Sequence, residues 1–137
     1  MKKIVLLTAL LATAAIAHDK IDDRTKKNMH GIHGDLQALI TRSYQVCPSF
    51  TVIDGLRTIE EQKEYYAKGT TTTLKSKHLT GHAFDFIPNP LDWNDINSFK
   101  TVGECIKTVA ERMSIPIQWG GDWKNFKDYP HIELKGY

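Results

Sequence analysis

The 137-residue sequence lacks several features that would assign its class at once. It has no repeats, no low-complexity segment and only two cysteines, and neither sign of charge dominates: 18 Lys and Arg stand against 16 Asp and Glu, a formal net charge of +2. A nucleic-acid-binding domain normally carries a basic stripe or a clear positive excess. We therefore expect no nucleic-acid partner. The length suits one domain with one hydrophobic core.

The first 17 residues are typical of an export signal. Lys2 and Lys3 give a positive start, residues 4–17 are almost wholly apolar, and Ala15-Ile16-Ala17 has the small-x-small form of a cleavage site. The apolar stretch is shorter than the ~20 residues that span a bilayer comfortably. We predict a signal peptide over residues 1–17, or a releasable signal anchor with transient membrane contact, followed by a single domain over residues 18–137. Loss of Lys2 and Lys3 would leave that domain formally neutral.

The two cysteines, Cys47 and Cys105, have two interpretations. An exported chain meets an oxidising compartment, where one disulfide can form between them. Both cysteines also lie in partly apolar stretches, where a free cysteine packs as a small hydrophobic side chain. The sequence leaves both interpretations open.

The spacing of apolar residues predicts alternating helices and strands. Residues 18–27 are charged and lack periodicity, which suggests a short mobile lead-in, whereas residues 28–46 have the stripe of an amphipathic helix. Thr58 and Glu61 form a capping box for a helix that ends near Lys68. A further helix is predicted from Ile96 to about Met113.

Strands are predicted over residues 50–53, 83–87 and 115–119, with a short alternating segment from His131. Asp54-Gly55 should break or bulge the first strand. The order of these elements predicts an α+β domain with a small, mostly antiparallel sheet.

The sharpest chemical signal is the segment 76–85, SKHLTGHAFD, which offers a histidine and a carboxylate around a predicted strand. Two-residue alternation places Asp85 on a face with small neighbours and places His82 on the other face with two phenylalanines. Small neighbours leave Asp85 the space that a metal ion and a substrate need. His78 and Asp85 are therefore the predicted ligands, and His82 is predicted to pack.

A third ligand is needed, because a catalytic zinc site usually has three protein ligands and an open position. His131 near the C-terminus is that ligand. Asp128, three residues earlier, is the predicted base, which would take a proton from water and pass it to a leaving amine. Asp122 is a second candidate for the base. Glu133 shares a strand face with His131, which it can orient from outside the metal site.

Two further features have competing interpretations. His30 and His33 are spaced i,i+3 on the predicted first helix and form a rival metal pair, but no third ligand accompanies them and an exposed helix face is the favoured interpretation. Trp119 and Trp123 flank Gly120-Gly121, which indicates tight backbone geometry or close approach of a ligand. The two tryptophans either line a groove or belong to the core.

These residues together carry a resemblance. The pattern S-x-H-x-x-G-x-A-x-D, followed by D-x-x-H-[IV]-E, resembles the zinc peptidases related to D-alanyl-D-alanine carboxypeptidases, and within them the L-alanyl-D-glutamate endopeptidases of phages and bacterial cell walls. The resemblance implies helices packed on one side of the sheet and a zinc cleft on the other. It also places the base three residues before the last histidine, at Asp128 and not Asp122.

The resemblance further implies a function. We expect zinc, held by His78, Asp85 and His131, to serve hydrolysis of the peptidoglycan stem peptide at the L-alanyl-D-glutamate bond by an exported monomer in the periplasm or cell wall. A D-alanyl-D-alanine carboxypeptidase or dipeptidase is the alternative within the class, and a non-catalytic wall-binding domain is the alternative outside it. Arg57 either binds a substrate carboxylate or carbonyl or forms a structural ion pair. The resemblance favours substrate binding for Arg57, with Ser76 also positioning the substrate.

Overall fold

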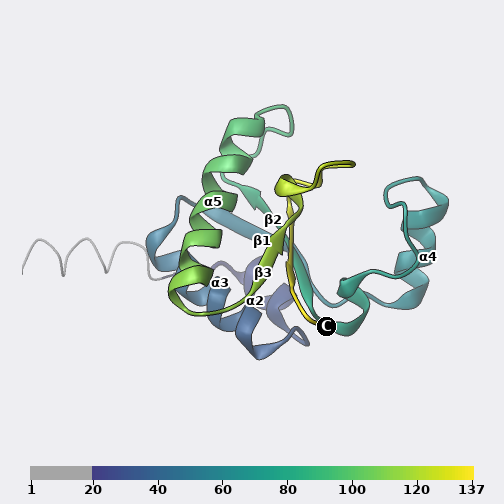
Figure 1. Cartoon of the computed structure of the whole chain (residues 1–137), viewed down its shortest axis with the longest axis horizontal. Coiled ribbons are helices and arrows are strands. Elements are labelled where there is room, and N and C mark those ends of the chain that lie inside the picture. Colours follow the sequence, from purple (N-terminus) through teal and green to yellow (C-terminus); the bar gives the residue numbers. More distant parts are fainter. Residues whose placement is uncertain (1–19) are drawn as a thin grey trace, which may run out of the picture.

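Four antiparallel strands form the sheet around which the chain is built (Figure 1). The computed structural model describes residues 20–137. Strands β1 (Phe50–Asp54), β2 (Ala83–Pro88), β4 (His131–Leu134) and β3 (Ile117–Trp119) lie side by side in the order β1-β2-β4-β3. All three pairings are antiparallel, which confirms the predicted α+β class. The predicted leader over residues 1–17 lies outside the described residues.

Helices α3 (Gly34–Val46) and α5 (Ile96–Arg112) pack on each other and cover one face of the sheet. Phe84 and Phe86 of β2 and Ile132 of β4 are fully buried in the core beneath them. Helix α4 (Ile59–Ala67) stands apart from these two helices, on the other side of the sheet (Figure 1). Within residues 20–137, no helix combines the length and the apolar character needed to cross a membrane.

A disulfide joins the two core helices. Cys47 follows the last residue of α3, Cys105 lies within α5, and their Cα atoms are 5.7 Å apart. Of the two interpretations that the sequence leaves open, the structure therefore has the disulfide.

The predicted helix over residues 28–46 is wrong in its first part. The chain instead forms α2 (Asp23–Met29), breaks at residues 30–33 and continues as α3. His30 follows the last residue of α2, and His33 precedes α3, where its ring accepts a hydrogen bond from the backbone of Asp35. The rival metal pair therefore does not share a helix face.

The predicted mobile lead-in over residues 18–27 is also wrong for residues 23–27, which belong to α2, and α2 packs along β1. Thr25 is fully buried, and its hydroxyl accepts a hydrogen bond from the Val52 amide at 2.9 Å. Asp22 accepts hydrogen bonds from Tyr44 and from Thr51. Polar contacts of Thr25 and of the N-cap residue Asp22 thus help to hold α2, and such contacts leave no apolar periodicity in its sequence.

Local signals in the middle of the chain are accurate. Thr58 and Glu61 form the predicted capping box at the start of α4. The register of β1 on β2 shifts between Val52 and Asp54, the predicted irregularity. Strand β3 begins at Ile117, two residues later than predicted.

Replacing Cys47 and Cys105 together by alanine should destabilise the protein without removing its fold. The disulfide closes a loop of 58 residues, and the loss of unfolded-state entropy on closing such a loop amounts to about 4 kcal/mol in the chain-entropy model. Urea unfolding of the oxidised protein and the double variant measures the difference, and zinc content serves as the control for an intact fold. A difference under about 1 kcal/mol would contradict the expectation.

Candidate metal centre

The three predicted ligands converge on the face of the sheet opposite the core. Asp85 of β2 is paired with His131 of β4 in the strand register, so their side chains project from neighbouring positions on one face. His78 reaches the same place from the short helix η1 (Lys77–Thr80), just before β2. One ligand atom from each residue lies within 4.8 Å of the other two.

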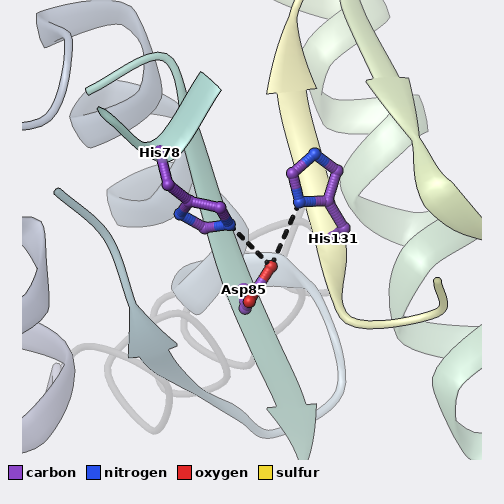
Figure 2. Close-up of side chains that lie close together, drawn as sticks. All are labelled: His78, Asp85 and His131. Carbon is purple, nitrogen blue, oxygen red and sulfur yellow. Dashed lines mark hydrogen bonds and ion pairs between the residues drawn. The ribbon is translucent and has the colours of Figure 1, made fainter. Parts of the chain in front are cut away.

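Both histidine rings point toward one oxygen of Asp85 (Figure 2). Asp85 Oδ1 is 3.1 Å from His78 Nε2 and 3.3 Å from His131 Nδ1. The histidines are buried, with 2% and 6% of their surfaces exposed. Two imidazole nitrogens and one carboxylate oxygen form a donor set that zinc binds well.

The far side of each ring is already occupied. His78 donates from Nδ1 to the Gly55 carbonyl at 2.8 Å, and His131 donates from Nε2 to Glu133 Oε1 at 2.8 Å. A neutral imidazole has one N–H, so the two remaining nitrogens present lone pairs to the Asp85 carboxylate. Such an arrangement fits a cation between the three groups, and the outer contacts fix which nitrogen faces it.

The contacts within the cluster shift the pKa values of His131 and Asp85 in opposite directions. Burial alone would lower the pKa of His131, but its hydrogen bonds with Asp85 and Glu133 raise the pKa to about 9. Burial alone would raise the pKa of Asp85, but the charge of His78 and the hydrogen bond with His131 outweigh it and hold the pKa well below its usual value. A metal bound here would compete with a proton for His131.

The orienting carbonyl of Gly55 is held in place by α2. A Cβ at Gly55 would lie 2.1 Å from the Asn28 carbonyl oxygen, so a side chain has no room there. Asn28 also donates from Nδ2 to the Val52 carbonyl at 2.9 Å. Helix α2 thus packs directly against the backbone that orients His78.

Ser76 acts locally in the structure. It precedes η1, and its hydroxyl accepts a hydrogen bond from the His78 amide at 3.2 Å. This contact shapes the turn that carries His78. A substrate contact of Ser76 stays a prediction.

Asp128 lies close enough to the centre to be influenced by its charges. A Cβ at Gly120 would lie 2.2 Å from the Asp128 carbonyl oxygen, so the absence of a side chain at Gly120 lets the loop that carries Asp128 approach closely. The surrounding protein and the negative charge of Asp85 raise the pKa of the Asp128 carboxyl above its usual value.

Asp122, the rival candidate for the base, has a different environment. Its carboxylate is 2.6 Å from Lys107 Nζ of α5, and 44% of its side chain is exposed. This ion pair directs Asp122 toward α5. The assignment of Asp128 as the base stays a prediction.

Arg57 is buried against the centre, with 8% of its side chain exposed. Its guanidinium group donates to Asp54 and, at 2.7 Å, to Gln62 Oε1. It also lies 3.7 Å from Asp85 Oδ2 and over the ring of Tyr65. The structure therefore contains the ion pair that was the alternative to substrate binding.

The two tryptophans have different roles. Trp119 is buried in the core, 2% exposed, and donates from Nε1 to the Tyr129 carbonyl at 2.7 Å. The Trp123 ring lies 5.2 Å from the His131 ring, beside the centre. His82, predicted to pack with the phenylalanines, instead stacks on Tyr137 with ring centroids 4.3 Å apart.

The sequence does not predict one ion pair near the centre. Lys77 Nζ lies 3.1 Å from Glu133 Oε2, on the outer side of the His131 ring. No local pattern signals this pair, because the two residues belong to segments far apart in the chain.

The fold and the site together define an α+β protein with a His-Asp-His cluster that could hold a metal ion, and comparison with known proteins identifies the family. The family model described as phage L-alanyl-D-glutamate peptidase matches residues 18–137. The L-alanyl-D-glutamate peptidase of Escherichia phage T5 is 32% identical over 123 residues, covering 85% of this chain and 89% of that protein. The chain therefore belongs to the phage L-alanyl-D-glutamate peptidase family.

Two bacterial proteins are also similar to this chain. The peptidoglycan L-alanyl-D-glutamate endopeptidase CwlK of Bacillus subtilis is 32% identical over 98 residues, covering 61% of this chain and 59% of that protein. The crystal structure of the Serratia marcescens L-Ala D-Glu endopeptidase ChiX superposes with a TM-score of 0.78 at 32% identity, covering 87% of this chain and 92% of that chain. The resemblance inferred from the motifs is thus confirmed.

The ligand set predicts which histidine substitutions remove metal. His78→Ala and His131→Ala should lose stoichiometric zinc, because each removes one of three protein donors. His30→Ala and His82→Ala are matched controls outside the centre and should keep one zinc per chain. Metal analysis of the purified proteins, with circular dichroism to check folding, decides the matter. Full zinc content in folded His78→Ala would overturn the assignment.

Proposed function

We propose that this chain is a zinc-dependent peptidoglycan peptidase that hydrolyses the L-alanyl-D-glutamate bond of the stem peptide. The observation that most directly supports this function is the convergence of His78, Asp85 and His131 in a member of the L-alanyl-D-glutamate peptidase family. The activities named for the phage and bacterial relatives support this bond as the target. The nitrogen and oxygen donors of the centre support zinc as the metal.

Metal binding and proton transfer are assigned to different residues in this proposal. Zinc held by His78, Asp85 and His131 would supply Lewis-acid polarisation of the scissile carbonyl and make water acidic enough to lose a proton near neutral pH. Asp128 takes that proton and delivers it to the amine that leaves. Its raised pKa suits both steps, because the carboxylate binds a proton more readily than an ordinary aspartate.

Substrate positioning by Arg57 and Ser76 belongs to the same proposal. Arg57 adds positive charge close to Asp85, where a polarised carbonyl oxygen would benefit from it. Its hydrogen bonds to Asp54 and Gln62 favour a supporting role over a direct substrate contact. Ser76 is partly exposed beside η1 and is the more accessible of the two.

We further propose export to the periplasm or cell wall, where peptidoglycan lies. The basic start, the apolar stretch and the Ala15-Ile16-Ala17 site support a signal peptide or a releasable anchor. The Cys47–Cys105 disulfide supports an oxidising destination. The protein would act there as a monomer.

Replacing Asp128 should abolish hydrolysis and leave the metal bound. Asp128→Ala removes the proton carrier without removing a ligand, so the rate should fall by about 10²- to 10⁴-fold. Asp128→Glu should keep part of the activity, and Asp122→Ala is the matched control at near wild-type rate. Mass spectrometry of purified peptidoglycan after digestion measures new amino termini at D-glutamate.

The same digestion separates the alternatives. Release of D-alanine without new D-glutamate amino termini would replace the proposed bond by that of a D-alanyl-D-alanine carboxypeptidase or dipeptidase. Zinc binding with no peptide cleavage would identify a non-catalytic wall-binding domain. An inactive Asp122→Ala beside a fully active Asp128→Ala would exchange the roles of the two aspartates.

The mature protein should begin at His18, because the apolar stretch ends in a small-x-small site. Mass spectrometry of protein from the cell-envelope fraction measures the N-terminus. An intact N-terminus on active soluble protein would support the releasable anchor instead. Full-length protein confined to the cytoplasm would contradict export altogether.

A further inference from the structure

Lys77 links the two chain segments that carry the histidine ligands. It immediately precedes His78 in η1, and its side chain extends to β4, which carries His131. Lys77 Nζ donates to the Leu134 carbonyl at 2.6 Å and lies 3.1 Å from Glu133 Oε2. The pair is largely shielded from solvent, with side chains 28% and 15% exposed.

Glu133 carries this contact on to the metal centre. Its Oε2 faces Lys77, while its Oε1 accepts the hydrogen bond from His131 Nε2 at 2.8 Å. The opposite ring nitrogen, Nδ1, faces Asp85 Oδ1 at 3.3 Å. The two carboxylate oxygens thus have different partners, and the orientation of Glu133 is determined from both sides.

The backbone already fastens these segments without the lysine side chain. The Lys77 carbonyl accepts from the His82 amide at 2.9 Å, and the His82 carbonyl accepts from the Leu134 amide at 2.9 Å. The fold at this point therefore does not depend on the ammonium group. What the ammonium group adds is a fixed partner for a flexible glutamate side chain, whose free rotation would otherwise have to be restricted by His131 alone.

A plain surface ion pair is the competing explanation, and such pairs are worth about 0–1 kcal/mol. Two observations argue against it. The ammonium group is shared between a carboxylate and a backbone carbonyl, which holds it in one place. The carboxylate it meets is the one that determines which nitrogen of His131 faces the ligand site.

We propose that Lys77 is a positioning residue of the metal centre. By holding Glu133, it keeps the His131 ring in the orientation that presents Nδ1 to a zinc ion. The inference rests on the zinc site of the proposed function, and it is independent of which bond the enzyme cleaves.

Zinc affinity, measured by competition with a chromogenic chelator, tests the proposal. Lys77→Met removes the ammonium group and keeps the length of the side chain, and it should weaken zinc binding about 10-fold, at the lower end of the effect of outer partners of metal ligands. Lys77→Arg should restore affinity to within about 3-fold of wild type by the same criterion. Lys75→Met, an exposed lysine two residues earlier, is the control and should bind zinc as wild type does.

A spectroscopic readout separates positioning from general stability. In zinc-loaded wild-type protein the Nε2–H proton of His131 should give a slowly exchanging signal in ¹⁵N-resolved NMR, because Glu133 holds it. The signal should broaden or exchange rapidly in Lys77→Met and return in Lys77→Arg. Thermal unfolding of each metal-free variant checks that the fold is intact.

A second variant keeps the test decisive if Lys77→Met does not fold. Glu133→Gln retains an oxygen for His131 and removes the charge that Lys77 binds, so it should also weaken zinc binding. Where Lys77→Met does fold, adding it to Glu133→Gln should cause little further loss, since the two residues act through one contact.

Two results would contradict the role of Lys77, and a third would bear on the proposed peptidase function alone. Zinc affinity within about 2-fold of wild type and an unchanged His131 signal in Lys77→Met would overturn the role of Lys77. Equal losses in Lys77→Met and Lys75→Met would also overturn it, because a general charge effect would then explain both. Zinc binding by the wild type without peptidoglycan cleavage would defeat only the proposed peptidase function, and the affinity comparison would still decide on Lys77.

Discussion

The pairing of β2 with β4 is the constraint on which the metal centre depends. In this register Phe84 faces Ile132 and Asp85 faces His131, so the pairing that buries the apolar residues also brings the two ligands together on the opposite face. A shift of one strand by one residue would turn its ligand into the core and its apolar side chains outward. Core packing under α3 and α5 therefore enforces the geometry of the site.

Much of the fold and of the candidate site is predictable from short stretches of sequence. The alternation from Ala83 to Phe86 separates core from site, and the histidines and carboxylate of the two motifs are the residue types that zinc requires. The capping box of α4 needs only residues 58 and 61, so a short window of sequence reveals it. The order of helices and strands follows from the same periodicities.

The remainder depends on partners far apart in the chain. His78 meets the Gly55 carbonyl across 23 positions, and Lys77 reaches the Leu134 carbonyl across 57. The sequence of α2 has no apolar spacing that would predict a helix, because its buried residue, Thr25, is held by hydrogen bonds. The prediction for His82 is wrong because strict alternation does not extend beyond the start of β2 at Ala83. His82 precedes the strand and stacks on Tyr137 instead.

The close contact between Asn28 and Gly55 has a consequence for the smallest fragment that can keep the candidate metal centre intact. Helix α2 supplies no ligand, yet it buttresses the carbonyl that orients His78. A trimmed version that starts at α3 would retain His78, Asp85, His131 and Asp128 but lose the support behind His78. A fragment that keeps this support therefore has to begin before Asp22, and the motif region alone does not define its boundary.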